Sequence, residues 1–254
     1  MKITDEVTVH EIRQEKVSNT KNRAFWSLEE KAIRWVPYRS NEEREEHLMN
    51  TIGSFDQSMC VPNEVRFDKS GLHLLSVSFY VPEETFGDEK LDSLNSLIGN
   101  SGLDFLGWEL DEARDNFIFE LAQYVNYDSE NDRLFGVSDF LTENLSQSTA
   151  LRLSEDITLF FTNEFLSGWC LKKASQKLAF EFEYQRGDEH KSLINLYYDI
   201  YNSRNMELMD DEDDGLKYKL KTALETLKVN NAHENKCGIF LIDAIKNSLD
   251  FHYQ

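Results

Sequence analysis

Residues 64–81 read EVRFDKSGLHLLSVSFYV and carry the clearest strand signal in the chain. The tetrapeptide at 68–71, DKSG, has the composition of a tight turn. Val65 and Phe67 precede it, and after it Leu75, Val77, Phe79 and Val81 alternate with Leu74, Ser76, Ser78 and Tyr80. Because side chains in a strand alternate between two faces, this pattern predicts a β-hairpin with one well-buried face.

A second segment with the same period covers residues 177–185. One face would carry Leu178, Phe180, Phe182 and Tyr184, and the other Ala179, Glu181, Glu183 and Gln185. This alternation predicts a half-exposed antiparallel strand.

In most of the remaining chain, apolar residues recur every three to four positions, which favours helices. We expect helices at 28–36 with Ser27 as N-cap, at 41–55 with Asn41 as N-cap, at 111–124 and at 154–172. Three further apolar stripes begin at Leu193, Leu216 and Ile239, and no proline follows Pro82. The predicted fold class is therefore α+β and helix-rich, with a small antiparallel sheet (hairpin near 64–82, strand near 177–185) and a helical C-terminal part.

Length and composition favour one compact unit. The 254 residues are 40% hydrophobic, and no linker rich in Pro, Gly or Ser interrupts them. We expect a single domain over 1–254, with two subdomains meeting near 133–150 as the alternative. No run of eighteen apolar residues occurs, and Cys60, Cys170 and Cys237 form no CxxC pair, as expected for free thiols in the cytoplasm.

The charge is strongly negative and unevenly spread. The formal charge is −20, and residues 41–132 hold 21 acidic and 5 basic side chains. Such a field argues against direct contact with nucleic-acid backbone and against docking on an anionic membrane. It is compatible with simple solubility, or with a surface that attracts a basic protein.

Catalytic and metal-binding signatures are incomplete. The run 209–215, MDDEDDG, resembles the start of an EF-hand loop in spacing only, because Lys221 stands where the bidentate glutamate is needed. We interpret it as an acidic linker between helices. Glu181 and Glu183 share one face of a predicted strand and are the alternative metal ligands, although the strand lacks the lysine of restriction-type nucleases. Cys237, after Lys236 at a helix start, is a weak candidate for a reactive thiol.

These observations predict a non-catalytic acidic protein with no cofactor that neutralises or inhibits a basic protein partner, either as an immunity protein or as a nucleic-acid mimic. The candidate partner-binding residues are the acidic clusters Glu42, Glu43, Glu45, Glu46 and Glu109, Asp111, Glu112. A divalent-metal-dependent hydrolase or nuclease using Glu181 and Glu183, and a scaffold or regulatory subunit of a larger complex, are the alternatives.

Overall fold

The protein is built mainly on β-sheets. The computed structural model describes residues 1–13, 22–54, 63–100, 106–115, 117–180, 182–184, 190–229, 232 and 235–253. These residues form fourteen strands in three sheets of seven, five and two strands. The expectation of a helix-rich fold with one small sheet is therefore wrong, although the C-terminal part is helical as predicted.

The largest sheet is mixed and has the strand order β14-β13-β2-β3-β6-β5-β4. Its strands are β2 (Arg23–Ser27), β3 (Ala32–Val36), β4 (Thr51–Gly53), β5 (Glu64–Asp68), β6 (Leu74–Tyr80), β13 (Leu178–Phe180) and β14 (Glu183–Tyr184). Only the β13–β2 pair is parallel. The hairpin of β5 and β6 lies inside this sheet and not at the margin of a small one.

The second sheet is antiparallel and has the order β10-β11-β12-β9-β8. Its strands are β8 (Tyr124–Asp128), β9 (Arg133–Val137), β10 (Ser148–Arg152), β11 (Ile157–Thr162) and β12 (Phe165–Lys172). The third sheet pairs β1 (Val9–Arg13) with β7 (Leu106–Leu110). Residues 133–150, proposed above as a subdomain boundary, run through β9 and into β10 of the second sheet.

Helices lie on the outside of the sheets and at one end of them. The α-helices are α1 (Asn41–Asn50), α2 (Leu91–Asn100), α3 (Asp139–Glu143), α4 (His190–Ile200), α5 (Ser203–Asp210), α6 (Asp214–Val229) and α7 (Lys236–His252). Short 3₁₀ turns are η2 (Asp88–Lys90), η3 (Leu145–Gln147) and η4 (Ala174–Gln176).

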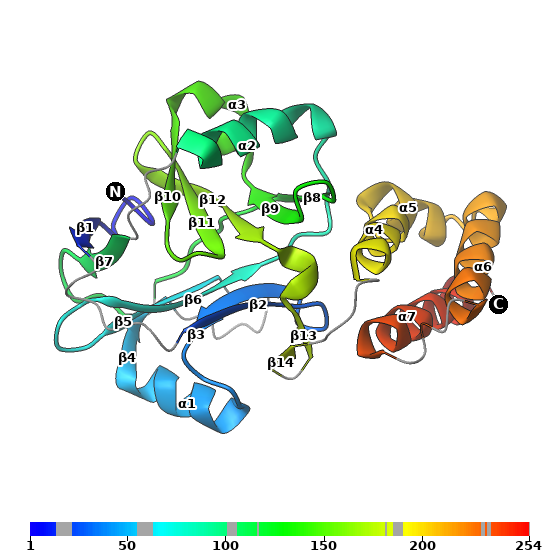
Figure 1. The fold of residues 1–254 in the computed structure, drawn as a ribbon, viewed down its shortest axis with the longest axis horizontal. Helices are drawn as coiled ribbons and strands as arrows, with labels where there is room; N and C mark the ends of the chain where they lie inside the picture. The colour runs from blue at the N-terminus through cyan, green and yellow to red at the C-terminus, as the bar shows by residue number, and fades with distance from the viewer. Residues whose placement is uncertain are drawn as a thin grey trace.

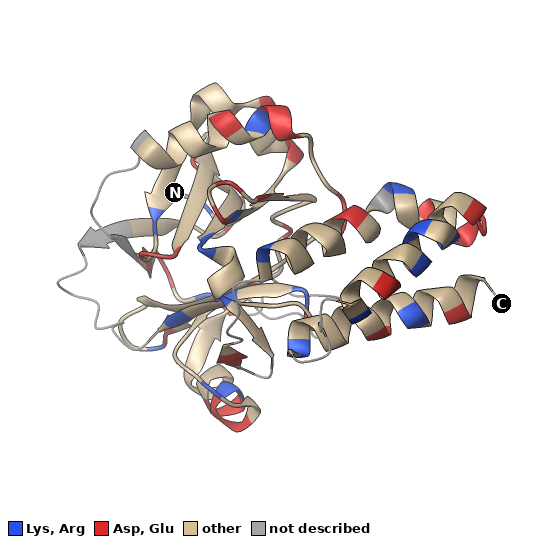
Figure 2. Cartoon of the chain, turned by 45° about the vertical axis from the view of Figure 1, so that its right-hand side comes forward, with Lys and Arg blue, Asp and Glu red and all other residues tan. Residues whose placement is uncertain are grey.

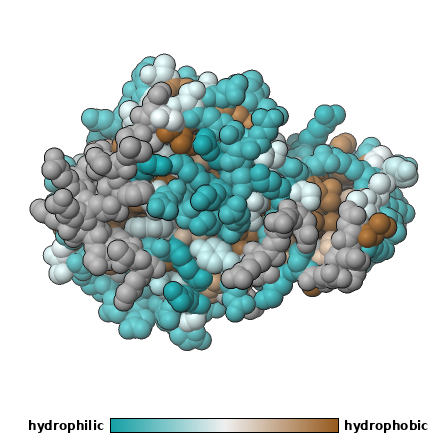
Figure 3. Space-filling model, viewed as in Figure 1, coloured by the Kyte–Doolittle hydropathy of each residue, from teal (hydrophilic) through white to brown (hydrophobic). Residues whose placement is uncertain are grey.

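Figure 1 shows the order of the layers: α2 and α3, the five-stranded sheet, the seven-stranded sheet and then α1. Helices α4–α7 stand together at one end of both sheets, and the turned view in Figure 2 keeps them there. The face drawn in Figure 3 is mostly hydrophilic, with apolar colour gathered over the helical end.

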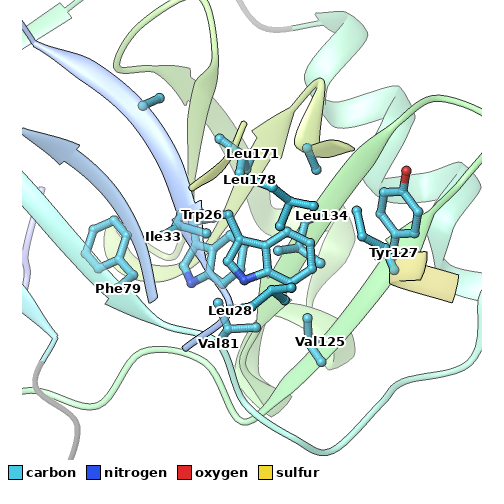
Figure 4. Packing of buried hydrophobic residues seen from close by; sticks show 14 of the residues in the cluster. Trp26, Leu28, Ile33, Phe79, Val81, Val125, Tyr127, Leu134, Leu171 and Leu178 are labelled. Carbon is cyan, nitrogen blue, oxygen red and sulfur yellow. The ribbon is translucent and has the colours of Figure 1, made fainter. Parts of the chain in front are cut away.

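The main core lies between the two large sheets. Trp26, Ile33 and Phe79 of one sheet join Leu134 and Leu171 of the other in a single cluster, part of which is drawn in Figure 4. The same cluster continues into α4–α7, and the Trp26 ring stacks on Tyr198 of α4 with centroids 6.1 Å apart. Apolar contact thus joins the helical end to the sheets, while the number of domains stays a prediction.

The predicted hairpin at 64–81 is present, with one shift in register. Phe67 pairs with Leu74 while Arg66 pairs with Ser76, so Leu75 is an extra residue in β6. This bulge places Leu74, instead of the expected Leu75, in the core with Val77 and Phe79.

The predicted helix at 154–172 is wrong, because this segment is the hairpin of β11 and β12. Every residue of β11 is buried, so the two-residue alternation that reveals a half-exposed strand is missing. The turn residues Asn163 and Glu164 both have positive φ, 48° and 72°, which is the geometry of a two-residue hairpin turn. Asn163 is the sequence feature that could have indicated this turn, because asparagine tolerates a positive φ.

Three other expected elements also differ. Residues 28–36 form a turn followed by β3, not a helix. The Ser27 hydroxyl accepts a hydrogen bond from the Glu30 amide within this turn and therefore caps no helix. Residues 111–115 and 117–123 form no helix, and β8 begins at Tyr124. The helix expected at 41–55 is shorter, because β4 begins at Thr51.

The strand expected at 177–185 is broken. β13 ends at Phe180, Phe182 has a positive φ of 69°, and β14 contains only Glu183 and Tyr184. A bulky residue with positive φ cannot continue a strand, so the chain folds back and β14 pairs with β13. β13 is buried, pairs antiparallel with the exposed β14 on one side and runs parallel to β2 on the other.

Candidate functional site

Helix α1 displays four exposed carboxylates on a helix that buries none of its residues. The Ser40 hydroxyl accepts a hydrogen bond from the Glu43 amide, so Ser40, and not Asn41, is the N-cap. Glu42, Glu43, Glu45 and Glu46 form no ion pair with another residue of the described chain. Hydrogen bonds from its own backbone and from Ser40 lower the pKa of Glu42.

The sheet surface next to α1 is polar and nevertheless buried. We call it the polar face, and its members are Arg34, Glu64, Arg66, Ser76 and Ser78, each 2–5% exposed. Buried charges are stable only when they are paired, and the Arg44 guanidinium of α1 lies 3.0 Å from the Glu64 carboxylate. His47 of α1 hydrogen-bonds the Ser76 hydroxyl at 2.8 Å. Helix α1 is thus attached to the sheet through polar contacts.

Arg66 closes the C-terminal end of α1. Its guanidinium donates to the Leu48 carbonyl (3.1 Å), the Thr51 carbonyl (2.8 Å), the Thr51 hydroxyl (3.0 Å) and the Ser54 carbonyl (3.0 Å). A cation at the C-terminal end of a helix also interacts favourably with the negative end of the helix dipole. Burial lowers the pKa of Arg66, while the nearby Asp115 and Glu64 carboxylates raise it.

The same buried environment shifts the pKa values of two further side chains of the site, His47 and Tyr38. Burial, followed by the charge of Arg66, lowers the pKa of His47 to about 4. Burial raises the pKa of Tyr38, whose ring centroid is 5.5 Å from that of His47, to about 12. Both side chains are therefore uncharged at neutral pH, and neither is matched to proton transfer at that pH.

A hollow of about 490 Å³ opens beside the C-terminal half of α1. Its lining consists of Glu45, Leu48, Met49, Thr51, Arg66, Lys69 and Asp115. We call it the α1 hollow. Lys69 Nζ donates to the Met49 carbonyl at 2.6 Å, and the Gly53 amide donates to the Asp115 carboxylate at 3.2 Å.

The second predicted cluster is partly paired. The Glu109 carboxylate lies 3.6 Å from His73 and the Asp111 carboxylate 3.0 Å from His10. Glu112 lies 3.1 Å from Arg114, an exposed pair. The α1 cluster therefore carries more unpaired negative charge than the cluster at 109–112.

The α1 hollow is lined by one acid of the α1 cluster and by none of Glu109, Asp111 and Glu112. Glu45 lines it from the α1 cluster, and Asp115 lines it three residues beyond Glu112. Other acids of the 41–132 segment lie elsewhere: η2 and α2 are on the opposite side of the sheets from α1 (Figure 1), and the red on α1 in Figure 2 is separate from theirs. The described acids of residues 41–132 thus lie on more than one side of the sheets.

Only Glu183 of the two alternative metal ligands is among the described residues, so the metal-site alternative stays a prediction. Glu181 lies outside the described residues, and the Glu183 carboxylate is exposed and 3.9 Å from Lys236 Nζ. Within the described ranges no group of three His, Cys, Asp or Glu side chains is placed to hold a metal ion. The acidic run 209–215 joins α5 to α6 as a linker, where Asp213 accepts a hydrogen bond from the Leu216 amide at 2.8 Å.

The cysteines that the structure describes are structural. Cys170 and Cys237 are buried, and burial raises the pKa of each thiol to about 12. The position of Cys237 in the first turn of α7 suggested a lowered pKa, but desolvation outweighs the helix N-terminus here. Cys60 lies outside the described residues.

Sequence reasoning missed a buried polar network at the base of the helical end. Asp132 accepts hydrogen bonds from the Tyr127 hydroxyl (2.8 Å), the Ser175 hydroxyl (2.8 Å) and the Ser175 amide (2.9 Å). His190 Nδ1 lies 3.1 Å from the Ser175 carbonyl. The residue types are those of a hydrolase triad, but the serine hydroxyl faces the aspartate and not the histidine. The network therefore fixes η4 and the start of α4 to the β8–β9 turn.

Comparison of the chain with protein-family models, with curated proteins and with solved structures gives no match. Within the described residues, no helix combines the length and the apolar character needed to cross a membrane.

Proposed function

We propose that this protein is a non-catalytic acidic binding protein that neutralises or inhibits a basic protein partner, and that α1 presents its binding surface. The observation that carries the proposal is the set of exposed carboxylates on α1 that form no ion pair within the part of the chain that the structure describes. Carboxylates of this kind pair with lysine and arginine and can occupy positions that phosphates would take in a nucleic-acid-binding cleft.

Rigid attachment of α1 supports the proposal. The Arg44–Glu64 pair, the His47–Ser76 hydrogen bond and the contacts of Arg66 hold the helix to the sheet at both its middle and its end. Charges held in fixed positions lose less conformational entropy on binding than charges on a flexible segment.

Electrostatic steering gives the proposal its kinetic consequence. The formal charge of −20 attracts any basic partner over a distance limited by screening, which is about 8 Å at physiological ionic strength. Surface charges near the contact therefore act mainly on the association rate, whereas buried contacts act on dissociation.

The test begins with capture of a partner from extract of the native cell and continues with association kinetics. The variant Glu42→Lys/Glu46→Lys reverses two α1 charges. The matched control, Glu207→Lys/Asp211→Lys, makes the same change in net charge at two exposed acids at the end of α5. We expect the α1 variant to associate on the order of tenfold more slowly at low salt, with a weaker salt dependence, and the control to stay near wild type.

Two results would contradict the proposal. Equal slowing in both variants would mean that net charge, and not α1, attracts the partner. A wild-type association rate that does not change with salt would mean that the acidic surface serves solubility alone.

A further inference from the structure

Three arginines on the α1 side of the seven-stranded sheet have oxygen acceptors. Arg66 donates four hydrogen bonds to backbone and hydroxyl oxygens. The other two form ion pairs, namely Arg34 with Glu30 and Arg44 with Glu64. Each of these cations is thus matched with an acceptor, as burial of a charge requires.

Arg23, the first residue of β2, is different. Its guanidinium lies over the rings of Phe25 and Tyr184, at 5.2 and 5.6 Å from their centroids. Its Nε and Nη2 atoms are buried and have no hydrogen-bond partner among the described residues. The rings contact the flat face of the group, whereas Nε and Nη2 form one of its edges. The rings therefore hold the guanidinium in place without satisfying these two donors.

This edge of Arg23 has the geometry of an oxyanion site. The N–H bonds of Nε and Nη2 run in parallel and can donate to two oxygens of one anion. A buried donor without an acceptor is unfavourable, so an incoming anion recovers the free energy that the folded chain leaves unused here. The neighbouring Tyr184 is 38% exposed, which places the edge close to the surface.

A second guanidinium group lies within electrostatic range of Arg23. Arg39 is exposed between β3 and α1 and forms no ion pair within the described part of the chain. Burial lowers the pKa of Arg23, and the positive charge of Arg39 lowers it further. The Glu43 carboxylate, which accepts from the Arg39 amide at 2.6 Å, acts in the opposite direction with a smaller effect. The positive field of the two arginines is therefore weakened and not cancelled.

We propose that Arg23 and Arg39 bind a phosphoryl group, an inference that goes beyond the proposed function and does not depend on it. Two oxygens accept from Nε and Nη2 of Arg23, and a third accepts from Arg39. A phosphoryl group suits the pair better than a carboxylate, because its oxygens point in more directions and its charge is about −1.5 to −2 at pH 7. The net charge of −20 opposes anion binding at long range, so we expect a Kd in the millimolar range.

The experiment follows the Nε–H signals of ¹⁵N-labelled arginines in the full chain during titration with sodium phosphate at constant ionic strength. Loss of one signal in Arg23→Lys assigns Arg23. We expect a saturable shift of the Arg23 signal, while the signal of Arg204, an exposed arginine of α5, stays unchanged. Sodium acetate should bind on the order of tenfold more weakly, because it has two oxygens and a single charge.

A second probe identifies the source of the phosphoryl group. A blocked Gly-phosphoserine-Gly peptide carries the same group on a peptide. Tighter binding of this peptide than of phosphate would support the site and indicate a phosphorylated partner. Equal binding would support the site and indicate a small phosphate ligand.

Two variants that each remove one exposed positive charge test the placement. Arg39→Gln should weaken phosphate binding on the order of tenfold, because a charge-assisted hydrogen bond is lost. Arg204→Gln makes the same change in net charge on α5 and should alter the Kd by less than about twofold. Glu43→Gln should instead tighten binding roughly threefold, because it removes the opposing charge and keeps an acceptor for the Arg39 amide.

Three outcomes would overturn the inference. The Arg23 signal stays unchanged in phosphate, acetate binds as tightly as phosphate, or Arg39→Gln and Arg204→Gln lose affinity equally. The last result would mean that phosphate responds to the net charge of the chain and not to these two arginines.

Discussion

The two faces of the seven-stranded sheet are both buried, but the inner face is apolar, whereas the outer face combines an apolar cluster around Phe25 and Phe182 with the buried charges and hydroxyl groups of the polar face. On the inner face Trp26, Ile33 and Phe79 are at most 1% exposed and pack against the five-stranded sheet. On the polar face Arg34 and Glu64 are 4–5% exposed and depend on specific partners. The comparison shows that burial alone does not indicate which kind of interaction holds a surface.

The difference has an energetic consequence. Apolar contacts on the inner face are many, individually weak and tolerant of small shifts. On the polar face, stability depends on a few directional contacts, because an unpaired charge away from water is strongly unfavourable. The inner face should therefore respond to side-chain volume, and the polar face to charge and pH.

The largest expected effect is on the inner face. Trp26→Ala should lower the free energy of unfolding by about 3–5 kcal/mol, because it removes a fully buried ring and its stack on Tyr198. Denaturant unfolding measures this change. The control Phe251→Ala removes a ring that is 77% exposed and should change stability by no more than about 0.5 kcal/mol. Equal effects in the two variants would contradict the described core.

On the polar face, Glu64→Ala should lower the free energy of unfolding by about 2–3 kcal/mol. The variant leaves Arg44 without the Glu64 carboxylate. Because the Arg44 side chain is 27% exposed, water offsets part of the loss. The exposed Glu45→Ala is the control on α1. Denaturant unfolding of Arg44→Met/Glu64→Met tests the cause, since removal of both charges should restore part of the stability. A double variant as unstable as the sum of its single variants would argue against the pairing.

A pH effect should also distinguish the two faces. The pKa of His47 is about 4 in the folded protein and about 6.5 in an unfolded chain, so the unfolded state binds the extra proton between these values. This contribution to stability is complete above pH 6.5 and is lost as the pH falls toward 4. We expect a loss on the order of 1–2 kcal/mol, reduced because His47 is only partly buried.

The measurement compares denaturant unfolding of wild type and His47→Asn at pH 7 and pH 4.5. The variant lacks the titrating group, so its stability should fall less over this range. Identical pH dependence of the two proteins would show that the polar face is insensitive to His47.

The smallest effect concerns the start of α1. Ser40→Ala removes the side chain that accepts from the Glu43 amide and should lower the free energy of unfolding by about 1 kcal/mol. Thermal unfolding measures it, with Ser96→Ala on the exposed side of α2 as control. A Ser40→Ala variant as stable as this control would show that α1 does not depend on its cap.

Several features could be predicted from sequence because their signals are local. The DKSG turn and the alternation around it gave the β5–β6 hairpin, and the long apolar stripes after Leu193 gave the C-terminal helices. Other strands were missed because burial on both faces removes alternation, as in β11, where consecutive apolar residues also fit a helical spacing.

The candidate site was only half predictable. The α1 glutamates were found because charge is visible in composition, although which of them are paired was not. Arg66 and Asp115 were missed, since they are 49 positions apart and meet at the hollow only through the fold.

By itself, the sequence determined the strong negative charge, the absence of complete catalytic motifs and the elements whose hydrophobic period is unbroken. These properties depend on composition or on neighbours within a few residues. Only the tertiary structure decided that a polar sheet face is buried next to α1, that the 109–112 acids are partly paired, and that Glu45 and Asp115 share one hollow. Burial and pairing are set by residues distant in the chain, and no local pattern encodes which of them meet.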